Sequence, residues 1–132
     1  MIESTKKPFT FRGKSIEELK SLDVREFAKY LKSRARRAIL RQFQDIEDFV
    51  SRAKKKAGKN KPIKTHKRTV IIVPQMVGMK IQTYNGHEFV PTEITKEMLG
   101  HRLGEFSPTR GKVKHGAAGI GSTKGSKSQA KK

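Results

Sequence analysis

Apolar residues in the first sixty positions recur at the spacing of helices. Ser15 and Glu18 fit a capping box, in which the serine hydroxyl accepts from a free backbone N–H and the glutamate reaches back. Gly58 and Asn60 are typical of the end of a helix. We therefore predict helices between these two points. The apolar positions that would face the core are Leu19, Leu22 or Val24, Phe27, Leu31, Ile46, Phe49 and Val50.

A change of pattern midway along the chain predicts strands. Residues 69–73 form a β-branched run, residues 79–84 alternate between apolar and polar, and the sequence HEFVPTEI follows at 87–94. Asn85 and Gly86 separate the last two runs. This dipeptide favours a type I′ hairpin turn, because that turn needs positive φ at both central positions. We expect a two- or three-stranded antiparallel sheet.

These elements predict an α+β fold, in which N-terminal helices pack against a small antiparallel sheet of two to three strands and a basic extended C-terminal tail follows. The sheet region is shorter than the roughly 40 residues that usually fold alone, so it must pack on the helices or on a partner. We divide the chain into an N-terminal arm and helical extension at 1–55, a basic linker at 56–69, a core with the hairpin and a short helical turn after Thr95 at 70–110, and a flexible basic tail at 111–132.

Positive charge is concentrated in two segments without acids. The 132 residues carry 31 lysines and arginines against 12 acidic residues, a formal charge of +19. Residues 52–69 hold nine basic side chains and residues 107–132 hold seven, whereas residues 70–106 are nearly neutral. A neutral folded unit with basic arms is typical of proteins that bind a dense polyanion, nucleic acid first. The longest apolar stretch falls far short of the roughly 20 residues of a membrane span, so we expect no membrane partner.

Most catalytic and metal chemistry finds no support in the sequence. The chain lacks cysteine, and its four histidines lack the paired spacing of a zinc site, so we expect no metal and no cofactor. A GxGxxG pattern in the tail fails because Lys124 stands where the third glycine is required. His87 with Glu88, or His101 with Glu105, would be the acid–base groups of a small ribonuclease. No second constellation supports them, and we expect no enzyme.

Residues 61–116 carry long motifs that point to a known family. The motifs are Asn85-Gly86-His87, Ile94, Leu99-Gly100, Leu103-Gly104-Glu105-Phe106 and Thr109. By these residues the chain closely resembles the universal small-subunit ribosomal protein nineteen family, in the archaeal and eukaryotic type with an N-terminal helical extension. The resemblance implies a cytoplasmic structural component of the small-subunit head. It implies binding to the 3′ domain of small-subunit rRNA beside small-subunit protein thirteen, with the tail directed toward the decoding region and tRNA.

The resemblance also implies RNA-contacting residues before the first strand, after the short helix and at the start of the tail. Carried over residue by residue, these are Lys61, Lys64, Thr65, His66 and Arg68, then His101 and Arg102, then Arg110, Lys112, Lys114 and His115. To these we add, for their charge, Arg36 and Arg37 in the helical region and Lys124 in the tail. The arginines between 34 and 41 are either a solvated helix face or phosphate contacts.

Recognition of RNA is expected to rest on shape and backbone. The chain has no RNP-like aromatic pair and only two tyrosines, so we assign Tyr84, Phe9 and Phe11 to packing rather than to base stacking. We expect no homo-oligomer. The alternative function is a non-ribosomal DNA- or RNA-binding architectural protein, such as a DNA-compacting or helix-turn-helix protein that uses the arginines at 34–41.

Overall fold

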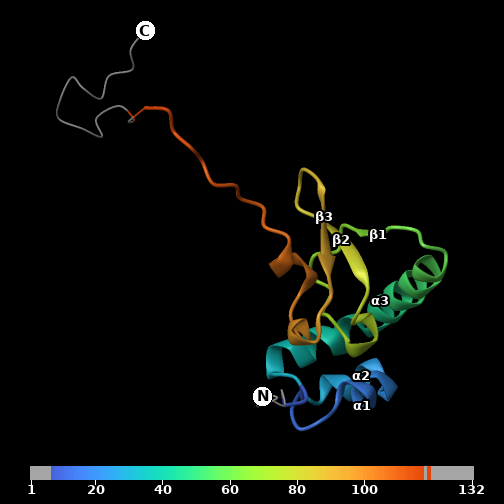
Figure 1. Ribbon diagram of the computed structural model, residues 1–132. Helices are drawn as coiled ribbons and strands as arrows, with labels where there is room; N and C mark the ends of the chain where they lie inside the picture. The colour runs from blue at the N-terminus through green and yellow to red at the C-terminus, as the bar shows by residue number, and fades with distance from the viewer. Residues whose placement is uncertain (1–6, 118, 120–132) are drawn as a thin grey trace, which may run out of the picture.

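The structure, a computed structural model, describes residues 7–117 and 119 (Figure 1). The helices are α1 (Ile16–Ser21), α2 (Val24–Ala28) and α3 (Ser33–Gly58). The strands are β1 (Ile63–Thr65), β2 (Lys80–Tyr84) and β3 (Phe89–Glu93). Three 3₁₀ turns lie among them, η1 (Pro74–Met76), η2 (Lys96–Met98) and η3 (Leu103–Phe106). The predicted α+β fold class is confirmed.

The first helix begins at the predicted cap. The Ser15 hydroxyl accepts from the backbone N–H of Glu18 at 3.3 Å, which satisfies one of the free donors of the first turn. The Glu18 carboxylate does not complete the expected box, because it faces Lys14 at 3.7 Å. A carboxylate does reach back at the second helix, where the Asp23 N–H donates to Glu26 at 3.3 Å.

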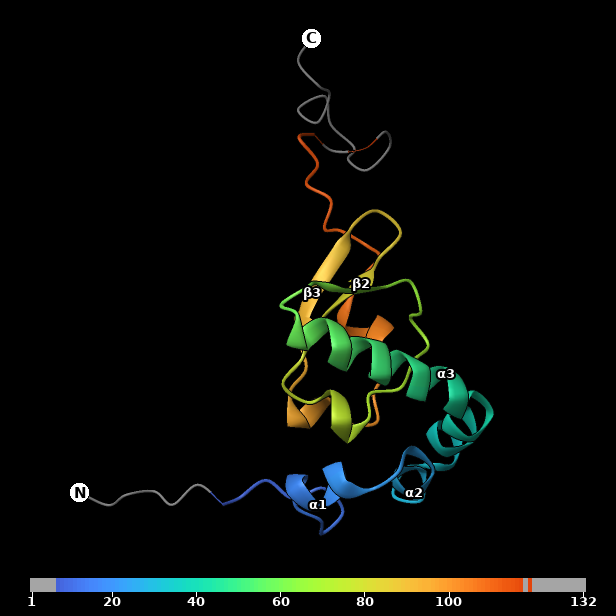
Figure 2. The same ribbon diagram turned by 90° about the vertical axis from the view of Figure 1, so that its right-hand side faces the viewer.

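Helix α3 is the longest element and forms one wall of the core. Its 26 residues bend at Gln42, whose φ of −116° and ψ of 18° are not helical. Figure 2 shows α2 below the N-terminal half of α3, and α1 beside α2 below the η1 turn. Its apolar face is buried against α2 and β1, so the sheet packs on the N-terminal helices as the short length of the sheet region required. The buried residues of α3 are Ile39, Ile46, Phe49, Val50 and Ala53.

The sheet has the order β1-β2-β3, and its hairpin is confirmed. Strands β2 and β3 are antiparallel, with Tyr84 opposite Phe89. The expectation that the whole sheet is antiparallel is wrong, because β1 runs parallel to β2 with Ile63 opposite Ile81. The expected strand at 69–73 is wrong too, because the strand that pairs with β2 beside the hairpin is β1, which lies earlier in the chain. A parallel pair needs a long crossover, and the β-branched run lies in it.

That β-branched run is buried rather than part of the sheet. The Ile72 N–H donates to the His101 carbonyl at 2.8 Å, and the Gly100 N–H donates to the Ile72 carbonyl at 3.1 Å. Residues 70–73 are all buried in the core. The run is extended, as its composition predicted, but its hydrogen-bond partner is the loop after η2.

The hairpin turn differs from the type I′ turn that the sequence favoured. Residues 85–88 form a four-residue loop, and within it only Gly86 has positive φ, at 100°. The Asn85 side chain closes the turn, because its carbonyl oxygen accepts from the N–H groups of His87 and Glu88, each at 2.8 Å. Asn85 therefore acts through its side chain and not through a left-handed backbone.

Candidate nucleic-acid interface

A hollow lined by arginines lies between the N-terminal half of α3 and the loops that pack on it. Its volume is about 130 Å³, several times the roughly 30 Å³ that one water molecule occupies in the liquid. Among the residues that the structure describes, no acidic side chain lines it. We call it the arginine hollow; its residues are Arg34, Arg37, Ala38, Arg41 and Gln42 of α3, with Thr69 and Arg102 from the loops.

Repulsion among the arginines of the arginine hollow lowers the stability of α3, the helix that carries most of them. Arg34, Arg37 and Arg41 are three and four residues apart on α3, and like charges at these spacings cost roughly 0.2–0.5 kcal/mol each. The first turn of α3 contains no acid, so its arginines also oppose the positive end of the helix dipole. No ion pair in the described part of the chain relieves them. Charges that repel one another in the free protein are typical of a site that binds an anion. The planar guanidinium group of arginine matches phosphate in particular, because it can donate two parallel hydrogen bonds to it.

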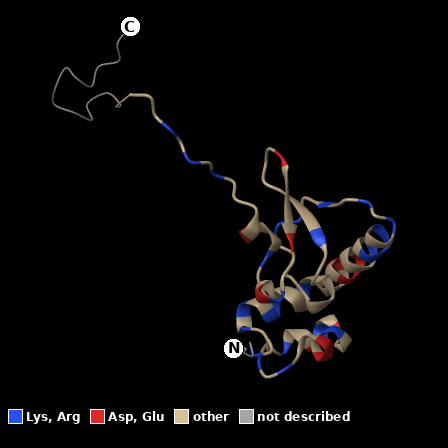
Figure 3. Cartoon of the chain, in the orientation of Figure 1, with Lys and Arg blue, Asp and Glu red and all other residues tan. Residues whose placement is uncertain are grey.

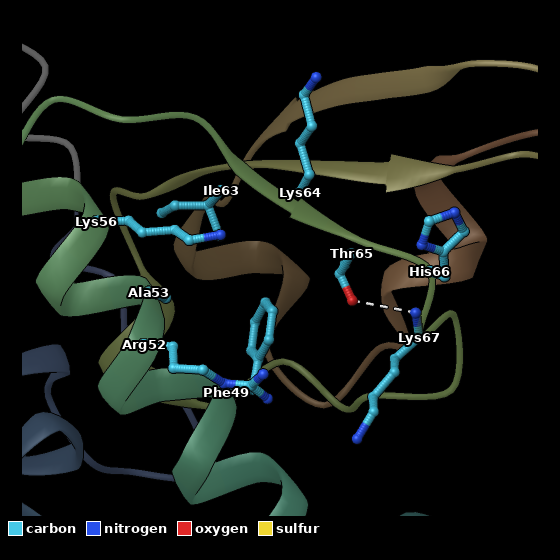
Figure 4. A pocket seen from close by; sticks show the side chains of 9 residues that line it. All are labelled: Phe49, Arg52, Ala53, Lys56, Ile63, Lys64, Thr65, His66 and Lys67. Carbon is cyan, nitrogen blue, oxygen red and sulfur yellow. Dashed lines mark hydrogen bonds between the residues drawn. The ribbon is translucent and has the colours of Figure 1, made fainter.

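A second basic hollow lies between the C-terminal half of α3 and β1 (Figure 4). Its volume is about 300 Å³. We call it the lysine groove; its residues are Phe49, Arg52, Ala53, Lys56, Ile63, Lys64, Thr65, His66 and Lys67. Figure 4 shows Lys64 extending from β1 away from α3, whereas the Lys67 side chain extends on the helix side.

The basic residues of the lysine groove have partial structural explanations. Lysines at the end of a helix interact favourably with its negative C-terminal dipole, so Lys56 also stabilises α3. Lys67 pairs with Asp45 at 3.1 Å, and the Arg52 Nε donates to the Asp48 carbonyl at 3.2 Å. Lys56 and Lys64 have no ion pair within the described residues. The charges of the groove are therefore balanced within the protein to a greater extent than those of the arginine hollow.

Arg68, one of the residues that the resemblance implied, holds three backbone segments together. Its guanidinium donates to the carbonyls of Tyr84 at 2.7 Å, Gly104 at 2.8 Å and Ser107 at 2.7 Å. The Ser107 hydroxyl in turn donates to the Thr83 carbonyl at 3.1 Å. We call this set of bonds the Arg68 clasp. It ties the end of β2 to the segment from which the tail departs.

The polar groups of two further predicted contacts bond within the protein. The Arg36 side chain donates to the carbonyls of Ala28, Lys29 and Leu31, at 3.3, 3.1 and 3.2 Å, and so satisfies the C-terminal end of α2. Thr65 is buried, and its hydroxyl accepts from the Lys67 N–H at 3.0 Å. The charge of Arg36 and the polarity of Thr65 thus already serve the fold.

The described start of the tail is exposed and basic. Residues 108–117 are exposed without exception, and they leave the domain next to the sheet (Figure 1). Figure 3 shows basic residues and no acid along this stretch. The predicted RNA contacts within it are Arg110, Lys112, Lys114 and His115, while Lys124 lies outside the described residues.

The histidine pairs considered for catalysis are placed far apart. His101 Nδ1 lies 2.7 Å from the Glu105 carboxylate, in a half-exposed pair. His87 and Glu88 belong to the hairpin loop, at the opposite end of β3 from η2 and His101 (Figure 1). In the described part of the chain no group of three or more acidic or histidine side chains is placed to hold a metal ion. In the same residues, no helix is both long and apolar enough to cross a membrane.

Several basic residues of these hollows do not stand among the predicted contacts. The sequence leaves Arg34 and Arg41 open between a solvated helix face and phosphate contacts, and they share one face of α3 with Arg37, a spacing that the sequence displays. Arg52 and Lys56 line the lysine groove only because β1, which pairs in parallel with β2, lies against α3. The helical period offered a signal for the first pair. The second pair depends on tertiary packing that no local pattern encodes.

Comparison with known proteins gives consistent matches. The family model described as "Ribosomal protein S19" matches residues 32–115, beginning beside α3 rather than at the motifs after Lys61. Three relatives carry the name "Small ribosomal subunit protein uS19". Identity is 45% over 119 residues with that of Methanococcoides burtonii (90% of this chain, 85% of the relative) and 49% over 122 residues with that of Methanocella arvoryzae (92% and 86%). It is 44% over 124 residues with that of Saccharolobus solfataricus (91% and 89%).

Proposed function

The chain belongs to the ribosomal protein S19 family, and from this membership we propose that it is a structural, non-catalytic constituent of the small ribosomal subunit that binds rRNA. The observation that carries the binding proposal is the arginine hollow, whose charges disfavour the free helix and have no acidic partner in the described residues. A phosphate group in the hollow would relieve the repulsion.

The contact surface that we propose has three parts. The arginine hollow and the lysine groove lie about 20 Å apart along α3, given 1.5 Å per residue, so each would meet a different stretch of backbone. The described start of the tail, an exposed segment with basic residues and no acid, is the third part. Arg36 and Arg68 are left out of this surface, and Thr65 lines the lysine groove without being a proposed RNA contact, because the polar atoms of all three already bond within the protein.

Finer aspects of the proposal follow from the family resemblance. The rRNA would be the 3′ domain in the head of the subunit, the neighbouring protein would be small-subunit protein thirteen, and the tail would point toward the decoding region and tRNA. The site of action is then the cytoplasmic ribosome. The exposed, acid-free start of the tail supports this placement, since such a segment can follow grooves that a folded domain cannot enter.

Binding to a 3′-domain rRNA fragment over a series of salt concentrations tests the proposal. We expect Arg37→Gln with Arg41→Gln to weaken binding and to reduce the slope of log K against log salt by up to about 1.4–1.8, at roughly 0.7–0.9 for each phosphate released. Lys20→Gln is the control, because Lys20 is exposed on α1 outside all three parts of the surface. An unchanged affinity and slope in the double variant would remove the arginine hollow from the interface.

The same assay separates the alternative function. Random duplex DNA, added at equal phosphate concentration, should compete weakly if the hollows and tail fit folded rRNA. Preference for the DNA would favour a DNA-binding architectural protein instead.

A further inference from the structure

Three aromatic rings meet on the sheet face that points away from the core. The ring centroids of His66 and Tyr84 are 4.7 Å apart, those of His66 and Phe89 are 5.1 Å apart, and those of Tyr84 and Phe89 are 5.0 Å apart. His66 directly follows β1, Tyr84 ends β2 and Phe89 begins β3. We call these three residues the aromatic cluster. It spans all three strands at the hairpin end of the sheet.

The alternation of the strands explains why this cluster is outside the core. Ile81 and Thr83 of β2 are fully buried, so the residues between and after them face the other way. Tyr84 and Phe89 are half-buried, and His66 is exposed. The rings fill no space in the interior. A partly exposed group of rings outside the core is more informative than single exposed apolar residues, which are common on protein surfaces.

The charges around the cluster suit a nucleic acid. Lys64 extends from β1 on the side away from α3 (Figure 4), and its Nζ lies 5.2 Å from the centroid of the Phe89 ring. Lys64 has no ion pair within the described residues. The Arg68 clasp places the start of the basic tail at the same end of the sheet, through the Tyr84 and Ser107 carbonyls. Glu88, in the hairpin loop, is the acid nearest in sequence to the cluster.

We propose that the aromatic cluster is a stacking platform for an unpaired RNA base, with Lys64 beside it for the adjoining phosphate. This inference rests on the proposed function, because it takes RNA as the partner. Aromatic rings on a sheet surface stack with single-stranded bases, and every base offers a π-face. Bases inside a duplex are already stacked and cannot reach the rings. The platform therefore selects a bulged, looped or terminal nucleotide.

The aromatic content of the chain makes a direct test possible. The protein has no tryptophan, so Tyr84→Trp introduces a single tryptophan reporter in the cluster. The full-length variant is titrated with a single-stranded oligoadenylate and with a blunt RNA duplex of equal phosphate number, while labelled RNA reports binding by anisotropy. We expect saturable quenching of the tryptophan by the single strand and little by the duplex. Bound single strand without quenching would overturn the proposal.

Affinity measurements give the second test. Tyr84→Ala and Phe89→Leu should each weaken single-strand binding by about 5- to 150-fold, the usual value of one stacked base, with the salt slope unchanged. Tyr84→Phe keeps the ring and should bind normally. Phe43→Leu is the matched control, because Phe43 is a half-buried ring on α3 that packs under Arg25 and lies outside the cluster. Circular dichroism of each variant is the check that it is folded.

The two levels of the argument fail in different ways. If the wild-type chain does not bind the 3′-domain rRNA fragment, the proposed function fails. If the wild type binds that fragment while Tyr84→Ala and Phe89→Leu bind the single strand as tightly as Phe43→Leu does, the platform is overturned and the proposed function stands.

Discussion

Replacing Arg68 should destabilise the fold rather than merely weaken RNA binding. Arg68→Gln removes three charged hydrogen bonds of 2.7–2.8 Å to the carbonyls of Tyr84, Gly104 and Ser107. Bonds of this kind are each worth about 1.5–3 kcal/mol. Because the site is only partly buried, water will satisfy some of the freed carbonyls, and the losses will not add. We expect a net loss of about 2–4 kcal/mol.

Thermal and urea unfolding followed by circular dichroism measures this loss. A loss of about 2–4 kcal/mol lowers the melting temperature of a domain of this size by about 10–25 °C. Arg68→Lys keeps the charge without the planar fork, so it should lose most of the same stability. Arg110→Gln is the control, since Arg110 is exposed at the start of the tail. If Arg68→Gln unfolds within about 0.5 kcal/mol of Arg110→Gln, the Arg68 clasp is not structural and Arg68 returns to the list of RNA contacts.

Two other predictions concern the tail and its anchor. Deleting residues 108–132 removes seven basic side chains and should reduce the salt slope of rRNA binding by up to about 5–6, whereas deleting only residues 120–132 removes four and should reduce it by up to about 3–4; an unchanged slope in both would exclude the tail from the interface. Gly104→Ala places a Cβ 2.9 Å from the Arg68 Cβ and should cost about 1–3 kcal/mol in urea unfolding, while Gly111→Ala meets nothing within 4 Å; equal stability of the two variants would contradict the packing argument.

The sequence predicted those parts of the fold whose cause is local. The cap at Ser15 and the antiparallel hairpin around Asn85 and Gly86 depend on residues a few positions apart, and both are present. The strand expected at 69–73 depends on which partner an extended run finds. That run bonds to the loop after η2, and the short β1, hidden in a lysine-rich segment, pairs with β2 instead. Composition predicts an extended backbone, but it does not predict the partner.

The sequence predicted those parts of the candidate site that depend on charge alone. The basic residues at the start of the tail are exposed, and Arg37 lines the arginine hollow, as expected of residues that contact a polyanion. Arg68 and Arg36 carry the same charge, yet their guanidinium groups donate to backbone carbonyls. A count of charges along the sequence cannot tell such an arginine from one that is free to bind phosphate. Of the aromatic cluster, the sequence assigns Tyr84 to packing, because no local pattern places another ring beside it. Its neighbours His66 and Phe89 join it only through the pairing of three strands.

The Arg68 clasp connects the proposed base platform to the tail. Arg68 follows His66 by two residues, and its guanidinium bonds to the Tyr84 carbonyl on one side and to the Ser107 carbonyl on the other. Two of the three rings and Ser107, the last buried residue before the tail, therefore depend on one side chain for their relative positions. A platform held rigid before binding spends less free energy on ordering when RNA arrives. It follows that Arg68→Gln, in addition to lowering stability, should weaken the preference for single-stranded over duplex RNA, although Arg68 itself touches neither.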